Sequence, residues 1–443
     1  MSALIKEGEL FPVYRRAFLH TINHIENEDF RVSSKTVSSD FTRKRKFSFK
    51  DLVVNILGFS RASVRTELDR FFKSLSGTGS EITTFSKSAF TQARQKLRPE
   101  SFICLNQSLL DYFKNNSPSQ RNWKGKRVVA IDGSFLVLPN EKCLIEKFGN
   151  FSNQNKTISA GARISIAYDV CNNIILDALI GHTQHDDEKE MAKNHLKNLN
   201  SETDILVFDR GYPSLWLISY LKKEGFDFCF RLSTAWKTAH ETLNSSIEKD
   251  IDFELKKRPS QEYGKLRSYN LQTKVEGLRL LSVDLPDGEQ EVLLTSLCNR
   301  DVYPVQAIKE LYHMRWGVEE CYKRIKQVAQ MEYFSGRTVH AIQQDFYARI
   351  ILLNISAMIG VQIEKAGQKD KGHKHAVQIN KTQVVTKVKD FLIDIFYRND
   401  IVCSVQKILK LLKNCTDIVR SNRSFKRIKV YKEKRKPLMY RGI

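Results

Sequence analysis

Two short apolar runs that each end in an aspartate constrain the fold of this chain most strongly. The runs RVVAID and DILVFD end at Asp132 and Asp209, and both have the length and the Val/Ile content of buried strands. Between them, ARISIAYDV and IILDALIG predict a hairpin, and a helix follows. A helix over residues 213–224 and a strand over 226–232 come next. This alternation predicts an α/β fold with a mixed sheet, and it places both aspartates at the ends of strands.

The chain is long enough for several folded parts. Its 443 residues correspond to about two to four domains. The periodicity of apolar residues predicts a helical region over 1–126, a core over 127–232 and 301–363, a β-rich insertion over 233–300, and a C-terminal region over 364–443. The last region combines a Lys-rich linker over 364–387, further helices over 384–412 and a basic tail over 420–443.

The charge of the chain points to a polyanionic partner. Lys and Arg number 72 against 50 Asp and Glu, which gives a net charge of +22. Such an excess favours nucleic acid first and an anionic membrane surface second. The N-terminus has no apolar signal segment, and the longest apolar run, residues 350–361, is too short to span a bilayer. We therefore expect a cytoplasmic protein without a membrane partner.

Part of the helical N-terminal region has the pattern of a DNA reader. In TTFSKSAFTQARQKLRPESF, Ser86 is placed to cap one helix and Pro99 to begin the next. The polar residues expected on the exposed face are Gln92, Arg94, Gln95 and Lys96. This pattern fits a helix-turn-helix and any helical pair with a solvated basic face equally well. The basic run at 43–46 would contact phosphates in the first case and solvent in the second.

A long helix expected from Pro304 to about Gln330 carries four polar residues on one face. Tyr312, Arg315, Glu319 and Lys326 stand at offsets 0, 3, 7 and 14. At this spacing they fall within an arc of about 60°. Tyr, Arg and Lys suit a phosphate backbone, whereas a lone Glu among them is explained if it binds a cation. Any exposed helix with one acid among bases remains the alternative.

The two strand-end aspartates supply a context for this helix. Neighbouring strand ends can place Asp132 and Asp209 close together, and Glu319 would complete a site of hard oxygen ligands. Such a site suits Mg²⁺ or Mn²⁺, and two ions about 3.5–4 Å apart would stabilise both oxygens of an in-line phosphoryl displacement. For either aspartate alone, capping of the next turn is the more common role.

Together these motifs resemble the DDE transposases of bacterial insertion sequences, in the branch with a Tyr-Arg-Glu-Lys signature. The signature here is YHMRWGVEECYKRIK, with IDGS at the first Asp and FDRGY at the second. The resemblance covers residues 123–353. It implies an RNase H-like core in which Asp132, Asp209 and Glu319 are the catalytic metal ligands of two Mg²⁺ ions, with Mn²⁺ able to substitute. Glu320 is a rival to Glu319, but it points about 100° further round the helix.

The resemblance also implies partners and a reaction. Tyr312, Arg315 and Lys326 would bind phosphates of the transposon end. We also expect residues 1–126 to bind the DNA end and residues 364–443 to dimerise, through the helices after Val384, and to contact DNA. The charge of the tail over 420–443 fits a DNA-contacting arm and a disordered solubilising tail equally well. The family chemistry is nicking, attack by the freed 3′ hydroxyl on the opposite strand, hairpin resolution and strand transfer into target DNA. The β-rich insertion would hold a flipped base during hairpin formation. Trp236 is a candidate to stack on that base, although a core tryptophan is the more common case.

Other readings of the sequence stay open. His182, His185 and the acids 186–188 resemble a metal cluster, but the acids are explained by helix capping. We find no nucleotide-binding fingerprint and expect no nucleotide cofactor. The alternatives to a dimeric, nucleoid-associated transposase are a metal-dependent nuclease or resolvase on the same core, and a non-catalytic, domesticated DNA-binding protein.

Overall fold

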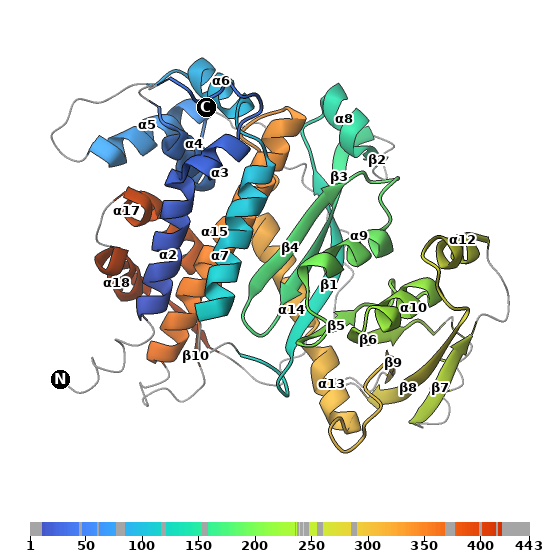
Figure 1. Ribbon diagram of the computed structural model, residues 1–443. Helices are drawn as coiled ribbons and strands as arrows, with labels where there is room; N and C mark the ends of the chain where they lie inside the picture. The colour runs from blue at the N-terminus through green and yellow to red at the C-terminus, as the bar shows by residue number, and fades with distance from the viewer. Residues whose placement is uncertain are drawn as a thin grey trace. The chain divides into compact units, whose positions relative to one another are not determined.

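The computed structural model describes residues 11–43, 47–59, 62–76, 85–116, 121–152, 158–234, 236, 239, 242, 248–254, 260–284, 290–367, 377–397, 401–412 and 415–418. The basic tail over 420–443 and, apart from Arg43, the basic run at 43–46 lie outside these residues. The chain forms two compact units (Figure 1). Unit 1 comprises residues 1–120, 135–162 and 323–443, and unit 2 comprises residues 121–134 and 163–322.

Unit 1 is mainly helical, as the periodicity predicts for its N-terminal part. Its elements are α2 (Phe11–Glu26), α3 (Glu28–Ser33), α4 (Phe49–Gly58), α5 (Val64–Ser76), α6 (Lys87–Gln95), α7 (Glu100–Asn116), α8 (Lys142–Phe148), β2 (Asn150–Ser152), the π-helical segment η2 (Arg324–Val328), α15 (Val339–Gly367), β10 (Val377–Ile379), α16 (Lys381–Asp390), α17 (Leu392–Tyr397), α18 (Ile401–Leu412) and β11 (Thr416–Ile418).

Helix α15 forms the centre of this unit. It packs against α4, α7 and α16. Helix α7 in turn packs on α2 (Figure 1). Its apolar residues lie on all sides, as expected for a helix surrounded by protein. Among the described residues, no helix is both long enough and apolar enough to span a membrane.

The linker predicted over 364–387 is wrong where the structure describes it. Helix α15 continues to Gly367, β10 pairs antiparallel with β11, and α16 begins at Lys381. The Asn380 side chain caps α16 by accepting a hydrogen bond from the Gln383 backbone N–H. The lysine-rich composition concealed β10 and the start of α16, whereas Val384 and Val388, which are buried, already lie in the helical region predicted from residue 384.

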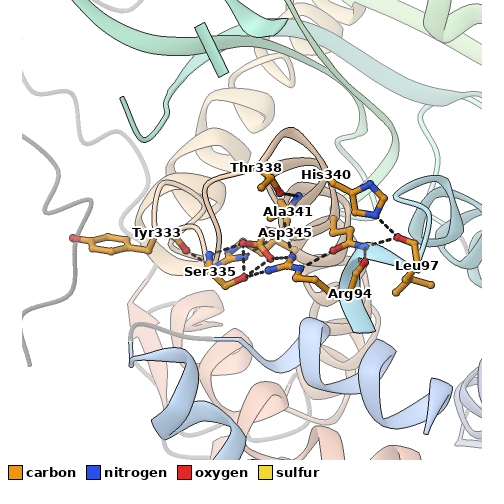
Figure 2. Close-up of polar contacts among 10 residues, drawn as sticks. Arg94, Leu97, Tyr333, Ser335, Thr338, His340, Ala341 and Asp345 are labelled. Atoms are coloured by element: carbon orange, nitrogen blue, oxygen red, sulfur yellow. Dashed lines mark hydrogen bonds and ion pairs between the residues drawn. The ribbon is translucent and has the colours of Figure 1, made fainter. Parts of the chain in front are cut away.

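The exposed face predicted for α6 is wrong at Arg94, which is buried. Its guanidinium forms an ion pair of 2.9 Å with Asp345 of α15 and also donates to Gln344 and Ser335 (Figure 2). Phe90, one helical turn earlier, is buried as well, so Arg94 lies on the face of α6 that packs inward. The predicted Ser86 cap is confirmed, because its hydroxyl accepts from the Ala89 N–H.

Unit 2 holds most of a nine-stranded mixed sheet. The elements not given above are β1 (Arg127–Val137), β3 (Ile158–Asp169), β4 (Ile174–Gly181), α9 (Glu188–His195), η1 (Leu196–Asn198), β5 (Asp204–Phe208), α10 (Leu215–Lys223), β6 (Asp227–Leu232), β7 (Lys249–Glu254), α12 (Ser260–Ser268), β8 (Lys274–Asp284), β9 (Gln290–Thr295), α13 (Val305–His313) and α14 (Trp316–Lys323).

The strand order defines the fold. The sheet runs β2-β3-β1-β5-β6-β9-β8-β7, and β4 pairs with β3. Strands β1, β5 and β6 are parallel, whereas β3 and β4 form the predicted antiparallel hairpin. All five residues of β5 are buried, which explains its continuous apolar sequence. The predicted class, an α/β fold with an RNase H-like mixed-sheet core and flanking helices, is confirmed.

The residues between β6 and α13 continue this sheet. Strand β9 pairs antiparallel with β6, β8 with β9, and β7 with β8. Helix α10 packs on β6 and β8, so the apolar core of unit 2 extends without a break from the first strands into these later ones. The segment is β-rich, and its strands are structurally part of the central sheet.

Two predicted elements differ from the structure. Strand β1 does not end at Asp132 but runs to Val137, because the apolar residues Leu136 and Val137 extend it. The long helix expected from Pro304 to Gln330 is α13, then α14, then η2. Between α13 and α14 the backbone tightens: the Arg315 N–H donates to Tyr312 O and the Gly317 N–H to Met314 O, which are three-residue rather than four-residue bonds.

Candidate active site

Asp132 and Asp209 lie on neighbouring parallel strands of unit 2. Ile131 of β1 is paired with Phe208 of β5, so the next residue on each strand is one of the two aspartates. Parallel strands present equivalent positions at the same edge, and the two carboxyl groups are therefore adjacent. Asp209 follows the end of its strand as predicted, whereas Asp132 lies where β1 stops pairing with β5.

Burial makes the charge of Asp132 costly. Loss of solvent around this half-buried carboxyl group raises its pKa to about 6, and the negative charges of Asp209 and Glu188 act in the same direction. The Gly133 N–H donates to Asp132 Oδ1 at 2.9 Å and opposes the increase, as does the charge of Arg315. A nearby cation would stabilise the charged form of this carboxyl group.

The structure brings three members of the predicted quartet together. The Tyr312 hydroxyl donates to Asp209 Oδ1 at 3.4 Å, and Arg315 Nη2 donates to Glu319 Oε1 at 3.0 Å. The Arg315 guanidinium carbon lies 5.6 Å from the centre of the Tyr312 ring. The break between α13 and α14 does not separate these side chains, because only Met314 and Arg315 lie between the two helices.

Helix α14 is held against the strand that bears the first aspartate. The hydroxyl of the buried Tyr322 donates to the backbone carbonyl of Asp132 at 2.6 Å. This contact fixes the height of α14 along β1 and so positions Glu319, one turn earlier. The rival Glu320 is exposed, in agreement with its predicted direction away from the quartet.

Lys326, the fourth member of the quartet, does not belong to α13 or α14. It is part of η2, which belongs to unit 1, and its side chain is half-buried. In η2 the Ala329 N–H donates to Arg324 O, a five-residue bond that adds one residue to the turn. Such π-helical turns are frequent at functional sites.

The donors present fit a divalent cation at the aspartate pair. Carboxylate oxygens are the ligands that Mg²⁺ prefers. The Tyr212 hydroxyl is buried beside this pair and has no hydrogen-bond partner among the residues that the structure describes. An orphaned polar atom next to two acids is typical of a site that takes water or an ion. Over the described ranges, however, no three His, Cys, Asp or Glu side chains gather closely enough to hold one ion, and Glu319 bonds to Arg315.

The other candidates have structural contacts. Trp236 is partly buried and its ring lies 4.9 Å from that of Phe253, within the core of unit 2. Asp187 caps α9 by accepting from the Lys189 N–H, as the capping interpretation predicts. A pocket of about 310 Å³ in unit 1, beside Arg94 and Ser335, contains none of the predicted site residues.

Three residues at the aspartate pair were not predicted as site residues. Tyr212 stands three positions after Asp209, Glu188 begins α9, and Arg163 of β3 forms an ion pair with Glu188. The motif FDRGY contains Tyr212 and was the available signal for it. Glu188 lies in the run 182–188 that resembles a metal cluster, but its acid was assigned to helix capping, which explains an acid in the first turn equally well.

The strand order and the paired aspartates define an RNase H-like protein with an acidic site at the edge of two parallel strands. A family model described as "Transposase DDE domain" matches residues 123–355. This match covers more than half of the chain, which therefore belongs to the DDE transposase domain family.

A curated relative and a solved structure are also similar. The chain is 24% identical over 292 residues to the transposase InsG for insertion sequence element IS4 of Escherichia coli strain K12. This alignment covers 65% of the chain and spans 63% of the length of that relative. A cryo-EM structure of the piggyBac transposase synaptic complex with hairpin DNA matches with a TM-score of 0.42 and 12% identity, over 91% of this chain and 84% of that one. The fold assignment rests on the strand order and the family match.

Proposed function

We propose that this protein is a DNA transposase that cleaves the ends of a mobile element and joins them to target DNA by metal-dependent phosphoryl transfer. The observation that carries the proposal is the adjacency of Asp132 and Asp209 on parallel strands of a DDE transposase domain, with Tyr312 and Arg315 beside them. We further propose a cut-and-paste route with a hairpin intermediate, carried out by a homodimer on double-stranded DNA in the cytoplasm at the nucleoid.

Asp132 and Asp209 would hold the Mg²⁺ or Mn²⁺ ions, with Glu319 as the third ligand. When bound, the ions would lower the pKa of water or a 3′ hydroxyl and stabilise the charge on the scissile phosphate. Ligation through Glu319 Oε1 would require this oxygen to exchange its hydrogen bond with Arg315. A phosphate oxygen is a suitable replacement partner for the guanidinium, so the arrival of DNA and the release of Glu319 would be linked.

Arg315 has the capacity for this second role. Its side chain is 4% exposed, and its Nε–H has no hydrogen-bond partner among the described residues. A phosphate oxygen would satisfy this donor. Tyr312, whose hydroxyl bonds to Asp209, would orient that carboxylate, and Lys326 would bind a further phosphate of the element end.

The test uses the full-length protein, its Glu319→Gln variant and a matched Glu320→Gln control. Each is incubated with Mg²⁺ and linear DNA that carries the flanks of its own gene, and the products are resolved on denaturing and native gels. We expect double-strand breaks with hairpin ends from the parent and from Glu320→Gln, and none from Glu319→Gln. Retarded but uncut DNA with all three proteins would contradict catalysis, and nicks alone would indicate a nuclease.

A further inference from the structure

A third carboxylate lies next to the aspartate pair and is fixed in place. Arg163 Nη1 of β3 forms an ion pair with Glu188 Oε1 at the first residue of α9. The other terminal nitrogen, Nη2, donates to the backbone carbonyl of Thr183 at 3.0 Å. Because the guanidinium is planar and rigid, two bonds in different directions determine where the Glu188 carboxylate lies.

This carboxylate lies against the backbone that follows Asp132. A Cβ atom added at Gly133 would be 3.2 Å from Glu188 Cδ and 3.3 Å from Oε1. Contacts this short mean that the Glu188 carboxylate directly covers the Gly133 backbone. A side chain at position 133 would push the Glu188 carboxylate away from Asp132, and glycine avoids this clash.

The orphaned hydroxyl of Tyr212 provides an independent observation. It is surrounded by the charges of Asp132, Glu188, Arg163 and Asp209, and its ring is buried in the core. A buried hydroxyl without a partner among the described residues indicates that a small ligand belongs at this point. The acids that face this point include Glu188 as well as the two aspartates.

We propose that Glu188 is a positioning residue that raises the affinity of the Asp132–Asp209 pair for divalent cations, and that Arg163 limits this affinity by partly neutralising Glu188. The proposal rests on the proposed metal-dependent function. It assigns opposite roles to two side chains that contact each other. Removal of one unit charge near a half-buried cation site changes the affinity by about tenfold.

The test measures Mn²⁺ binding to the full-length protein by isothermal titration calorimetry at constant ionic strength, with no DNA and no turnover. We expect Glu188→Gln to weaken Mn²⁺ binding about tenfold and Arg163→Gln to strengthen it. Asp187→Asn is the matched control: it removes the same charge one residue earlier, on an exposed side chain, and asparagine retains the helix cap. This control should bind Mn²⁺ like the parent.

The outcomes distinguish a structural role of the Arg163–Glu188 pair from an electrostatic one. A merely structural pair would weaken binding in both variants, which would overturn the proposal, as would equal losses in Glu188→Gln and Asp187→Asn. If Arg163→Gln does not fold, the comparison of Glu188→Gln with Asp187→Asn decides alone. The variant Asp132→Asn distinguishes failure of the proposed metal site from failure of the proposed role of Glu188. If the parent binds Mn²⁺ and this variant binds it equally well, the proposed metal site itself is wrong. If binding needs Asp132 but is indifferent to Glu188, only the present proposal fails.

Discussion

The half-buried carboxyl group of Asp132 lowers the stability of the folded protein at the neutral pH at which it is charged. Its pKa rises from 3.8 to about 6 on folding, chiefly because burial removes solvent. Between about pH 4 and pH 6 the folded state thus binds more protons than the unfolded state, so this group lowers the free energy of unfolding as the pH rises through that window. Above about pH 6 the free energy of unfolding is lowered by the full amount that this pKa shift causes.

The variant Asp132→Asn should therefore be more stable than the parent but inactive. At pH 7.5 without divalent cations we expect its free energy of unfolding to exceed that of the parent by about 1–2 kcal/mol, since solvent screens part of the effect. Urea unfolding measures this difference. At pH 4 the two proteins should be equally stable, and a constant difference at both pH values would contradict the assignment.

A second residue-level prediction concerns Tyr322. Its hydroxyl holds α14 on the Asp132 carbonyl, so Tyr322→Phe should lower the free energy of unfolding by about 1–2 kcal/mol. If this bond positions α14, the rate of DNA cleavage should fall by a larger factor than the folded fraction of the protein does, because Glu319 would no longer be held at a fixed position along β1. Cleavage rates at a temperature where both proteins are folded provide the measurement. An unchanged rate would mean that α14 is held by its apolar contacts alone.

Among the elements of unit 1, α6 and α15 are connected by a buried ionic network. Arg94 bonds to Asp345 and Gln344, Ser335 bonds to Asp345 through both its hydroxyl and its backbone N–H, and the His340 ring donates to the Leu97 carbonyl (Figure 2). An arginine in this environment fixes the position of one helix relative to the other. It is not available to contact DNA.

Breaking this network should destabilise the protein strongly. We expect Arg94→Ala to lower the free energy of unfolding by about 3–5 kcal/mol, because Asp345 would remain buried and unpaired. The double variant Arg94→Met/Asp345→Leu should recover part of this loss. Arg98→Ala, at a half-exposed arginine three residues after α6, is the control and should change stability by less than about 0.5 kcal/mol. Loss of DNA affinity without loss of stability in Arg94→Ala would favour the sequence interpretation instead.

The sequence predicted the elements well where one local signal dominated. The apolar run of β5, the hairpin of β3 and β4 and the capped start of α9 were predictable, because burial, turn and cap leave distinct patterns. The continuation of β1 beyond Asp132 and the break before α14 depend on tertiary partners. The burial of Arg94 depends on Asp345, which lies about 250 residues away, so no local pattern could reveal it. The proximity of Glu188 to Asp132 was hidden for the same reason, since only the folded sheet brings the two residues together.

For the whole molecule, the net charge of +22 predicts how binding to DNA responds to salt. A protein that neutralises several phosphates releases their counterions, and its affinity falls as a power of the salt concentration. We expect the dissociation constant for linear DNA to rise about a thousandfold or more between 50 and 200 mM NaCl. Fluorescence anisotropy with a labelled duplex measures this dependence. A flat response would count against DNA as the partner.

The contact between Tyr322 and Asp132 has a consequence for synthesis of the chain. These residues are 190 positions apart, and all of β7, β8 and β9 is translated between them. At about 5–20 residues per second, the strand with the first aspartate waits roughly 10–40 s for the helix that covers it. During this time the sheet edge that bears Asp132 is made without α14 to cover it. The order of the elements therefore delays assembly of the acidic site around Asp132 until most of the protein has been made.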